Sequence, residues 1–326
     1  MEYSKIRIVY MGTPEFAVAP LSALVNAGIE IAGIVTAPDK PAGRGKKIQS
    51  SAVKKYADAH LTCPVFQPEK LKNPDFNQGL KELNADIFVV VAFRMLPESV
   101  WSMPPLGTVN LHASLLPQYR GAAPINWCII NGETESGVST FIINKEIDTG
   151  KILLQEQVRI DPADTAGILH DKMMVVGSHL LVKTVTELAS GTLEAIDQAA
   201  FQIPEDELKR APKIFKEDCM IDWKRPGAEV HNLIRGLSPY PGAFTAISAD
   251  GVDFFQMKIF ESIFVPGAAG ESHGNIQSDN SKFMRITTPD GYIDIRSVQL
   301  PGKRRMDTEE FLRGNKSDVN NWKISV

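Results

Sequence analysis

Short apolar runs alternate with amphipathic segments along roughly the first 190 residues of the chain. Runs of this length, bounded by Gly or Pro, are typical of buried parallel strands, and the segments between them are typical of helices that cover a sheet. Strands are predicted at residues 6–11, 30–36, 87–93 and 108–112. Helices are predicted at residues 15–26, 50–59 and 165–188, the first with Thr13 as N-cap and Pro14 as its first residue. This order predicts the α/β class, with an open, mostly parallel sheet that binds ligands at the carboxyl ends of its strands.

The pattern changes further along the chain. Two runs at residues 139–144 and 151–160 flank a short polar segment, which predicts a hairpin added to the sheet. After residue 211 the chain shows short strands with Asp-Gly turns and a closing helix, which predict a small, mostly β, barrel-like domain. The expected division is a first domain at 1–189, a linker at 190–210 and a second domain at 211–326.

Composition narrows the class of protein. With 326 residues, 43% apolar and 23% charged, the chain has the make-up of a soluble globular protein of about two domains. Its net charge of −4 argues against a globally basic nucleic-acid binder, although local basic patches are allowed. The apolar runs are too short to span a membrane, and the first residues do not resemble a signal peptide. Three unclustered cysteines (Cys63, Cys128, Cys219) predict reduced thiols, so we expect a cytoplasmic protein.

The densest candidate chemistry lies in the strand predicted at residues 108–112. Side chains alternate faces along a strand, so Asn110 and His112 project to the same side while Leu111 enters the core. An amide N–H beside an imidazole suits a carbonyl oxygen that gains negative charge, because the amide donates a hydrogen bond and the imidazole can exchange a proton. A structural Asn and a core His are the alternative, but two polar residues on one face of an apolar strand favour a site.

A histidine in such a role usually has a carboxylate that orients its ring. Asp148, in the segment Asp148-Thr149-Gly150, is the candidate. Aspartate is common in turns for local reasons, so its role depends on the fold bringing this turn to the Asn110 and His112 strand.

A cationic segment follows the second predicted strand. Residues 38–47 carry four cations, two Gly and two Pro without an apolar anchor, and we expect a flexible loop that reaches a polyanion. A plain solvated loop is the alternative. The Gly12-Thr13-Pro14 sequence lacks the GxGxxG spacing and the chain has no Walker A pattern, which argues against an NAD fingerprint and a P-loop.

Several motifs agree in order and spacing with one known family. The segments Asn110-x-His112-x-Ser114-Leu115-Leu116-Pro117, Arg120-Gly121-Ala122-Ala123-Pro124-Ile125 and Asp148-Thr149-Gly150 resemble the signature of the folate-dependent formyltransferases. The opening residues 11–17, the loop around Arg44 and residues 237–243 are most similar to the members that act on methionyl-tRNA. The resemblance covers the chain from about residue 5 to its end.

This resemblance implies a Rossmann-like catalytic domain and a C-terminal domain resembling an OB fold. It implies formyl transfer from 10-formyltetrahydrofolate to the α-amine of initiator methionyl-tRNA. We separately expect a monomer that needs no metal and binds no membrane. It implies that Asn110, His112 and Asp148 are the catalytic residues. It assigns folate contacts to Phe93, Arg94, Met95, Leu96, Ser114, Leu115, Leu116 and Pro117. We expect tRNA contacts from Lys40, Arg44, Lys46, Lys47, Lys209, Arg210, Lys213 and Arg304.

The sequence departs from the family pattern at two positions: Arg94 stands where a Gly after an aromatic residue is commoner, and Gln118 replaces an expected cation. Three other readings remain at this stage. One is formyl transfer to a nucleotide-linked amino sugar, which the loop around Arg44 disfavours. The others are a dinucleotide-dependent oxidoreductase, which the absent glycine fingerprint disfavours, and a non-catalytic RNA-binding protein, which the intact Asn110, His112 and Asp148 disfavour.

Overall fold

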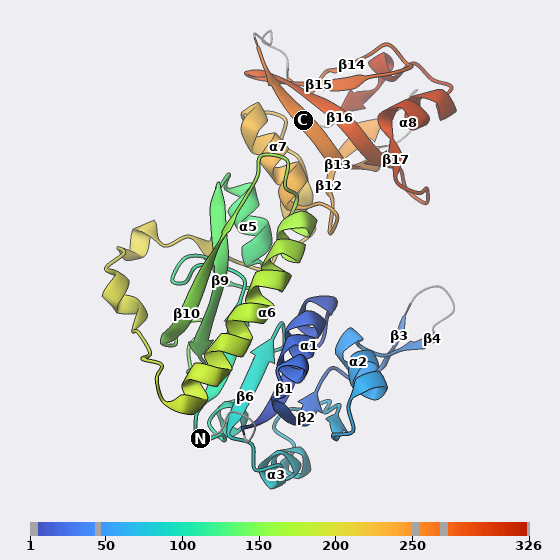
Figure 1. Ribbon diagram of the computed structural model, residues 1–326. Coiled ribbons are helices and arrows are strands. Elements are labelled where there is room, and N and C mark those ends of the chain that lie inside the picture. The colour runs from blue at the N-terminus through green and yellow to red at the C-terminus, as the bar shows by residue number, and fades with distance from the viewer. Residues whose placement is uncertain (1–5, 43–46, 250–253, 268–272, 325–326) are drawn as a thin grey trace. The chain divides into compact units, whose positions relative to one another are not determined.

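The computed structural model describes residues 6–42, 47–249, 254–267 and 273–324 (Figure 1). The chain forms two compact units, each built from segments that are not contiguous in sequence. The first unit consists of residues 1–121, 135–159 and 170–210. The second unit consists of residues 122–134, 160–169 and 211–326.

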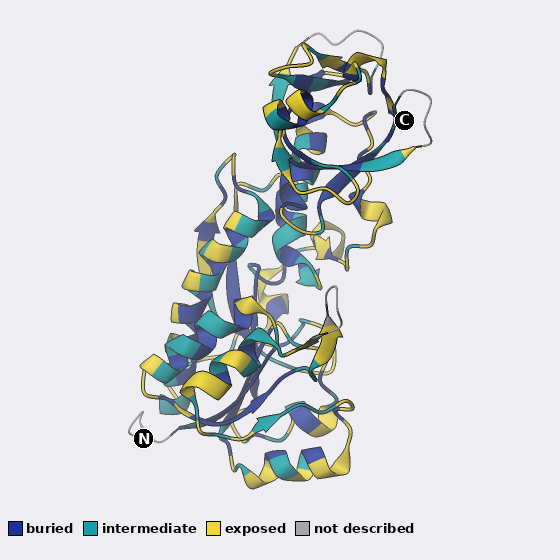
Figure 2. Cartoon of the chain, turned by 90° about the vertical axis from the view of Figure 1, so that its right-hand side faces the viewer, coloured by how far each residue is buried: buried dark blue, intermediate teal, exposed yellow. Residues whose placement is uncertain are grey.

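A seven-stranded sheet with the order β10-β9-β7-β6-β1-β2-β5 forms the centre of the first unit. Its strands are β1 (Arg7–Gly12), β2 (Glu30–Val35), β5 (Val65–Phe66), β6 (Ile87–Val91), β7 (Thr108–His112), β9 (Glu135–Ile142) and β10 (Ile152–Arg159). All neighbours pair in parallel except β9 with β7 and β10 with β9, which are antiparallel. The predicted parallel sheet and its added hairpin are therefore confirmed. Figure 2 shows these strands largely in the colour of buried residues, as expected for a sheet covered by helices.

The helices of this unit follow the apolar pattern of the sequence. They are α1 (Val18–Asn26), α2 (Ala52–His60), α3 (Pro74–Glu82), the short α4 (Glu98–Trp101) and the part of the long α6 (Ala166–Ser190) from residue 170 onward. The prediction that Thr13 caps the first helix was wrong, because Glu15–Ala17 forms a 3-10 turn that starts after Pro14 and has no side-chain cap. The sequence reading also missed α3, where Asn73 accepts hydrogen bonds from the Asp75 and Phe76 amides as N-cap. Short 3-10 turns also occur at Gln198–Phe201 and Glu205–Glu207 in the linker.

The cationic segment after β2 has regular structure at its base. Lys40–Ala42 (β3) pairs antiparallel with Lys47–Gln49 (β4), so the prediction of a flexible loop over residues 38–47 is wrong for residues 40–42 and 47. Asp39 holds the start of this hairpin: its carboxylate accepts from Lys54 Nζ at 2.6 Å and from Gln67 Nε2 at 2.8 Å. The Lys54 hydrogen bond is the main reason that the pKa of Asp39 is lowered.

A nearly closed antiparallel sheet dominates the second unit and confirms the predicted barrel-like domain. Its strand order is β14-β15-β16-β13-β12-β18, and β17 pairs with β16. The strands are β12 (Ala243–Ser248), β13 (Phe255–Pro266), β14 (Ile276–Ser278), β15 (Met284–Thr288), β16 (Gly291–Gln299), β17 (Met306–Asp307) and β18 (Lys323–Ile324). The helices are α5 (Pro124–Ile130), α7 (Gly227–Gly236) and α8 (Thr308–Gly314). The core of the unit surrounds Trp223, which is fully buried.

The stability of the second unit should decrease on mild acidification because of His231 in α7. Burial, and next the nearby Arg235 charge, lower the pKa of His231 below 6.5. Below pH 6.5 the unfolded chain therefore binds a proton at His231 more readily than the folded unit does. The free energy of unfolding of this unit therefore decreases as the pH is lowered. We expect the wild-type melting temperature to fall more between pH 8 and pH 5 than that of His231→Gln, which can still hydrogen-bond to Ser262 Oγ. Equal pH slopes in thermal unfolding would contradict this prediction.

Candidate active site

Strand β7 presents Asn110 and His112 on one face, as predicted. The intervening Leu111 is 3% exposed and packs into the core. The sheet register places Asn110 opposite Val90 of β6 and Phe141 of β9. Asn110 is half-buried, and its side chain has no hydrogen-bond partner within the residues that the structure describes. Its amide is therefore available to donate to a bound substrate.

The ring of His112 is oriented by a backbone carbonyl. Its Nε2 lies 2.9 Å from the carbonyl oxygen of Tyr119. A carbonyl can only accept, so Nε2 carries a proton and the neutral ring has Nδ1 free. Nδ1 lies 3.9 Å from Oδ2 of Asp148, and the two side chains are 7% and 15% exposed. The two groups therefore face each other in a mostly dry environment.

Asp148 occupies the turn that joins β9 and β10, and the fold does bring this turn to His112. Its backbone has a φ of 56°, a left-handed conformation that aspartate and asparagine tolerate better than most residues. Its Oδ2 accepts the amide N–H of Gly121 at 2.9 Å. The separation of 3.9 Å between His112 Nδ1 and Asp148 Oδ2 is within ion-pair distance but too long for a direct hydrogen bond. The Tyr119 carbonyl is the direct hydrogen-bond partner of the ring, and the role of Asp148 in holding the ring stays a prediction.

These three side chains can serve acyl transfer in complementary ways. Asn110 offers a neutral donor for a developing oxyanion. Nδ1 of His112 and Oδ2 of Asp148 are two acceptors 3.9 Å apart that share one edge of the site. A substrate N–H or a proton can be received by either of them, which is the requirement for moving a proton from an attacking nitrogen to a leaving nitrogen.

Two family models cover most of the chain. Residues 4–185 match the formyl transferase model, and residues 213–316 match the model of the formyl transferase C-terminal domain. The chain belongs to the formyl transferase family.

Curated relatives and solved structures agree with this assignment. The chain is 51% identical over 314 residues to the methionyl-tRNA formyltransferase of Bacteroides fragilis, covering 96% of each chain. It is 52% identical over 322 residues to that of Azobacteroides pseudotrichonymphae, covering 97% of this chain and 98% of the relative. A Helicobacter canadensis N-formyltransferase, solved with folinic acid and dTDP-3-aminofucose, has a TM-score of 0.65 at 22% identity, covering 89% of this chain and 98% of that chain. At that identity it supports the fold alone.

In this formyl transferase, the two segments predicted to bind folate lie side by side. Strands β6 and β7 are parallel neighbours, so residues 93–96 after β6 and residues 113–117 after β7 leave the same edge of the sheet. Arg94 does not extend freely: its guanidinium donates to the carbonyls of Pro68 and Glu69 and stacks 5.6 Å from the centre of the Phe93 ring. Met95 is 71% exposed, whereas Leu96 packs into the core.

The segment after β7 is partly internal. Ser114 and Leu116 are buried, with the Ser114 hydroxyl donating to the Gln118 carbonyl at 2.7 Å. Leu115, Leu116 and Pro117 border an open cavity of about 560 Å³, together with residues of β10 and of the linker. Of the eight predicted folate residues, four are thus buried: Leu96, Ser114, Leu116 and Pro117.

Gln118 binds the linker where the family pattern suggested a cation. Its Oε1 accepts the amide of Lys209 at 2.7 Å, and its Nε2 donates to the carbonyl of Glu207 at 3.3 Å. The backbone amide of the next residue, Tyr119, donates to the carbonyl of Lys209 at 2.7 Å.

Sequence reasoning missed two backbone groups of the site, the Tyr119 carbonyl that binds His112 and the Gly121 amide that binds Asp148. The one signal was the run of small residues after Arg120, which permits close packing.

The cationic residues predicted to bind tRNA differ in their exposure and in their partners within the protein. Arg44 and Lys46 lie outside the described residues, whereas Lys40 is exposed on β3. Arg210 forms an ion pair with Glu205, and Arg304 forms one with Glu310. Lys213 stacks on Phe215 at 5.3 Å from the ring centre, and the side chain of Lys209 is exposed.

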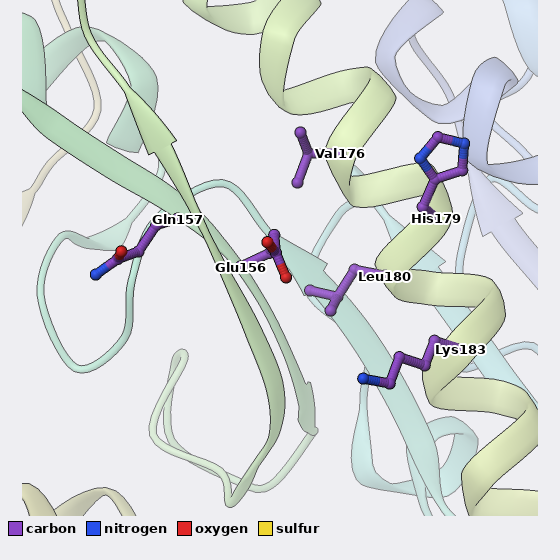
Figure 3. Close-up of a pocket in the computed structure, with 6 residues that line it drawn as sticks. All are labelled: Glu156, Gln157, Val176, His179, Leu180 and Lys183. Atoms are coloured by element: carbon purple, nitrogen blue, oxygen red, sulfur yellow. The ribbon is translucent and has the colours of Figure 1, made fainter.

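A second cavity of about 320 Å³ lies between β10 and α6, away from the three candidate catalytic side chains. Figure 3 shows Glu156 pointing toward α6, Gln157 pointing away from it, and Lys183 reaching from the helix toward the strands.

Within the described part of the chain, no group of three or more His, Cys, Asp or Glu side chains could hold a metal ion. Among the same residues, no helix is both long and apolar enough to cross a membrane.

Proposed function

We propose that this enzyme transfers the formyl group of 10-formyltetrahydrofolate to the α-amine of methionine on initiator tRNA. The main support is about 50% identity over nearly the whole chain to proteins named methionyl-tRNA formyltransferase. The juxtaposition of Asn110, His112 and Asp148 supports the chemistry.

In the proposed reaction the neutral methionyl amine attacks the formyl carbon. A C–N bond forms, and the carbonyl electron pair moves to oxygen, where Asn110 Nδ2 donates a hydrogen bond to the negative charge. The amine nitrogen then loses a proton to the acceptor pair formed by Nδ1 of His112 and Oδ2 of Asp148. Collapse of the intermediate re-forms the carbonyl and breaks its bond to the folate nitrogen, which takes up a proton. The Nε2–H bond to the Tyr119 carbonyl keeps the ring oriented through both transfers.

We further propose that residues 1–189 carry the chemistry, that 190–210 serve as linker and that 211–326 contribute contacts to tRNA. We also propose that the enzyme acts as a monomer. The three free cysteines, which are far apart in the sequence, support a cytoplasmic location.

The decisive assay is transfer of labelled formyl from 10-formyltetrahydrofolate to charged initiator methionyl-tRNA, with charged elongator methionyl-tRNA alongside. We expect transfer to the initiator alone. No transfer to either tRNA, with the folate still bound, would refute the tRNA substrate and favour an amino-sugar acceptor.

Arg44 provides a test of the cationic arm, which we define as residues 38–49. The loss of one phosphate contact in Arg44→Ala should lower kcat/KM for whole tRNA about 10-fold and make its log–log salt dependence shallower by about 1. A small formyl acceptor such as a methionyl ester should be used equally well by both proteins. Lys55→Ala, which removes an exposed cation from α2, is the matched control. Equal losses with whole tRNA and the small acceptor would assign the arm a structural role instead.

A further inference from the structure

A buried side-chain amide from the linker holds the turn that carries Asp148. Gln198 is 5% exposed. Its Nε2 donates to the backbone carbonyls of Asp148 at 2.9 Å and Gly150 at 2.8 Å. Its Oε1 accepts from Nε of Arg120 at 3.0 Å and from Nη2 of Arg120 at 2.6 Å. All four hydrogen-bonding positions of this amide are therefore occupied.

Backbone hydrogen bonds of the linker fix the position of the Gln198 side chain. Ile196 exchanges two backbone hydrogen bonds of 2.8 Å with Ile152, the first residue of β10. Asp197 then caps the 3-10 turn Gln198–Phe201 by accepting the amide of Ala199 at 3.0 Å. Residue 198 is thus fixed against the start of β10, immediately beside the turn at residues 148–150.

The side-chain amide of Gln198 connects two segments, the 148–150 turn and the segment that contains Arg120 and Gly121. On one side it holds the two carbonyls that flank Thr149. On the other side it binds Arg120, whose neighbour Gly121 donates its amide to Asp148 Oδ2 at 2.9 Å. Because Asp148 has a left-handed backbone with a φ of 56°, its conformation depends on such external contacts.

We propose that Gln198 is a positioning residue that sets the place of the Asp148 carboxylate relative to Nδ1 of His112. This inference rests on the proposed function for its kinetic consequence. Among the described residues, the side-chain hydrogen bonds of Gln198 go to Arg120 and to the carbonyls of Asp148 and Gly150 and not to His112, so it acts through the 148–150 turn and Arg120. The linker is then part of the architecture of the active site as well as a connection.

The Gln198→Glu variant distinguishes a role in positioning Asp148 from a role that consists only of accepting hydrogen bonds from Arg120. In Gln198→Glu the side chain keeps its size and still accepts from Arg120, but it places a carboxylate against two carbonyls that have lost their donor. Displacement of Asp148 should lower kcat by on the order of 10–100-fold, because catalytic groups act only within narrow geometric limits. KM for both substrates should stay within about 2-fold, since no binding contact is removed. Gln198→Ala should show the same separation of kcat from KM, and the exposed Gln78→Ala in α3 is the matched control.

Hydrogen exchange measured by mass spectrometry gives a readout that does not depend on activity. Peptides that cover residues 119–121 and 148–150 should exchange faster in both Gln198 variants, while peptides from β1 should keep wild-type protection. Wild-type kcat in Gln198→Glu, or loss of protection throughout β1, would overturn the inference. If the wild-type protein fails to formylate methionyl-tRNA, the proposed function fails, and the exchange experiment still decides whether Gln198 holds the turn.

Discussion

Replacing Asp148 by asparagine is expected to lower kcat by about 10²–10⁴-fold, the usual contribution of general acid–base catalysis. Asparagine tolerates the left-handed backbone at this position and can still accept the Gly121 amide, so the substitution removes the charge and one proton acceptor while the turn is retained. KM for methionyl-tRNA should change little, because Asp148 is proposed to act on the transferred proton and not on the tRNA.

The control for this variant is Glu146→Gln, which removes an exposed carboxylate from the same turn region. It should leave kcat at the wild-type value. Single-turnover measurement of formyl transfer with saturating folate and tRNA isolates the chemical step in both variants. If Asp148→Asn transfers formyl as fast as the wild type, Asp148 has no part in moving the proton.

The second large effect is expected at Asn110. In Asn110→Ala the oxyanion loses its neutral donor, and removal of one such donor typically costs about 2.7–4 kcal/mol, or roughly 10²–10³-fold in kcat. Asn110→Asp should be worse than Asn110→Ala, because it replaces the donor with a negative charge at nearly constant size. The Asn110 side chain makes no hydrogen bond within the described residues, so neither change breaks an observed side-chain hydrogen bond.

The order of the two Asn110 variants is the informative result. It is measured as kcat for formyl transfer at fixed pH, with thermal unfolding to verify that both variants fold. An Asn110→Asp enzyme as active as the wild type would show that no negative charge develops beside residue 110. Equal activity of the Ala and Asp variants below the wild type would indicate a packing role only.

Much of the fold could be predicted because its determinants are local. The apolar runs that form β1, β6 and β7 appear directly in the sequence, and the alternation along residues 108–112 predicted that Asn110 and His112 share a face. Elements with weak local signals were missed. Strand β5 has only two residues, and the pairing of β3 with β4 spans a segment that reads as polar and irregular.

The sequence by itself determined the fold class, the family resemblance and the identities of the three candidate catalytic residues, because strand periodicity and motif spacing are properties of neighbouring residues. Only the tertiary structure decided how those residues are held. His112 ends strand β7, whereas Asp148 lies in the turn between β9 and β10. The Tyr119 carbonyl that orients the ring and the Gly121 amide that binds the carboxylate come from one segment, and the buried Gln198 comes from another. Such contacts depend on backbone direction and side-chain packing between segments distant in sequence, which no local pattern of residue types encodes.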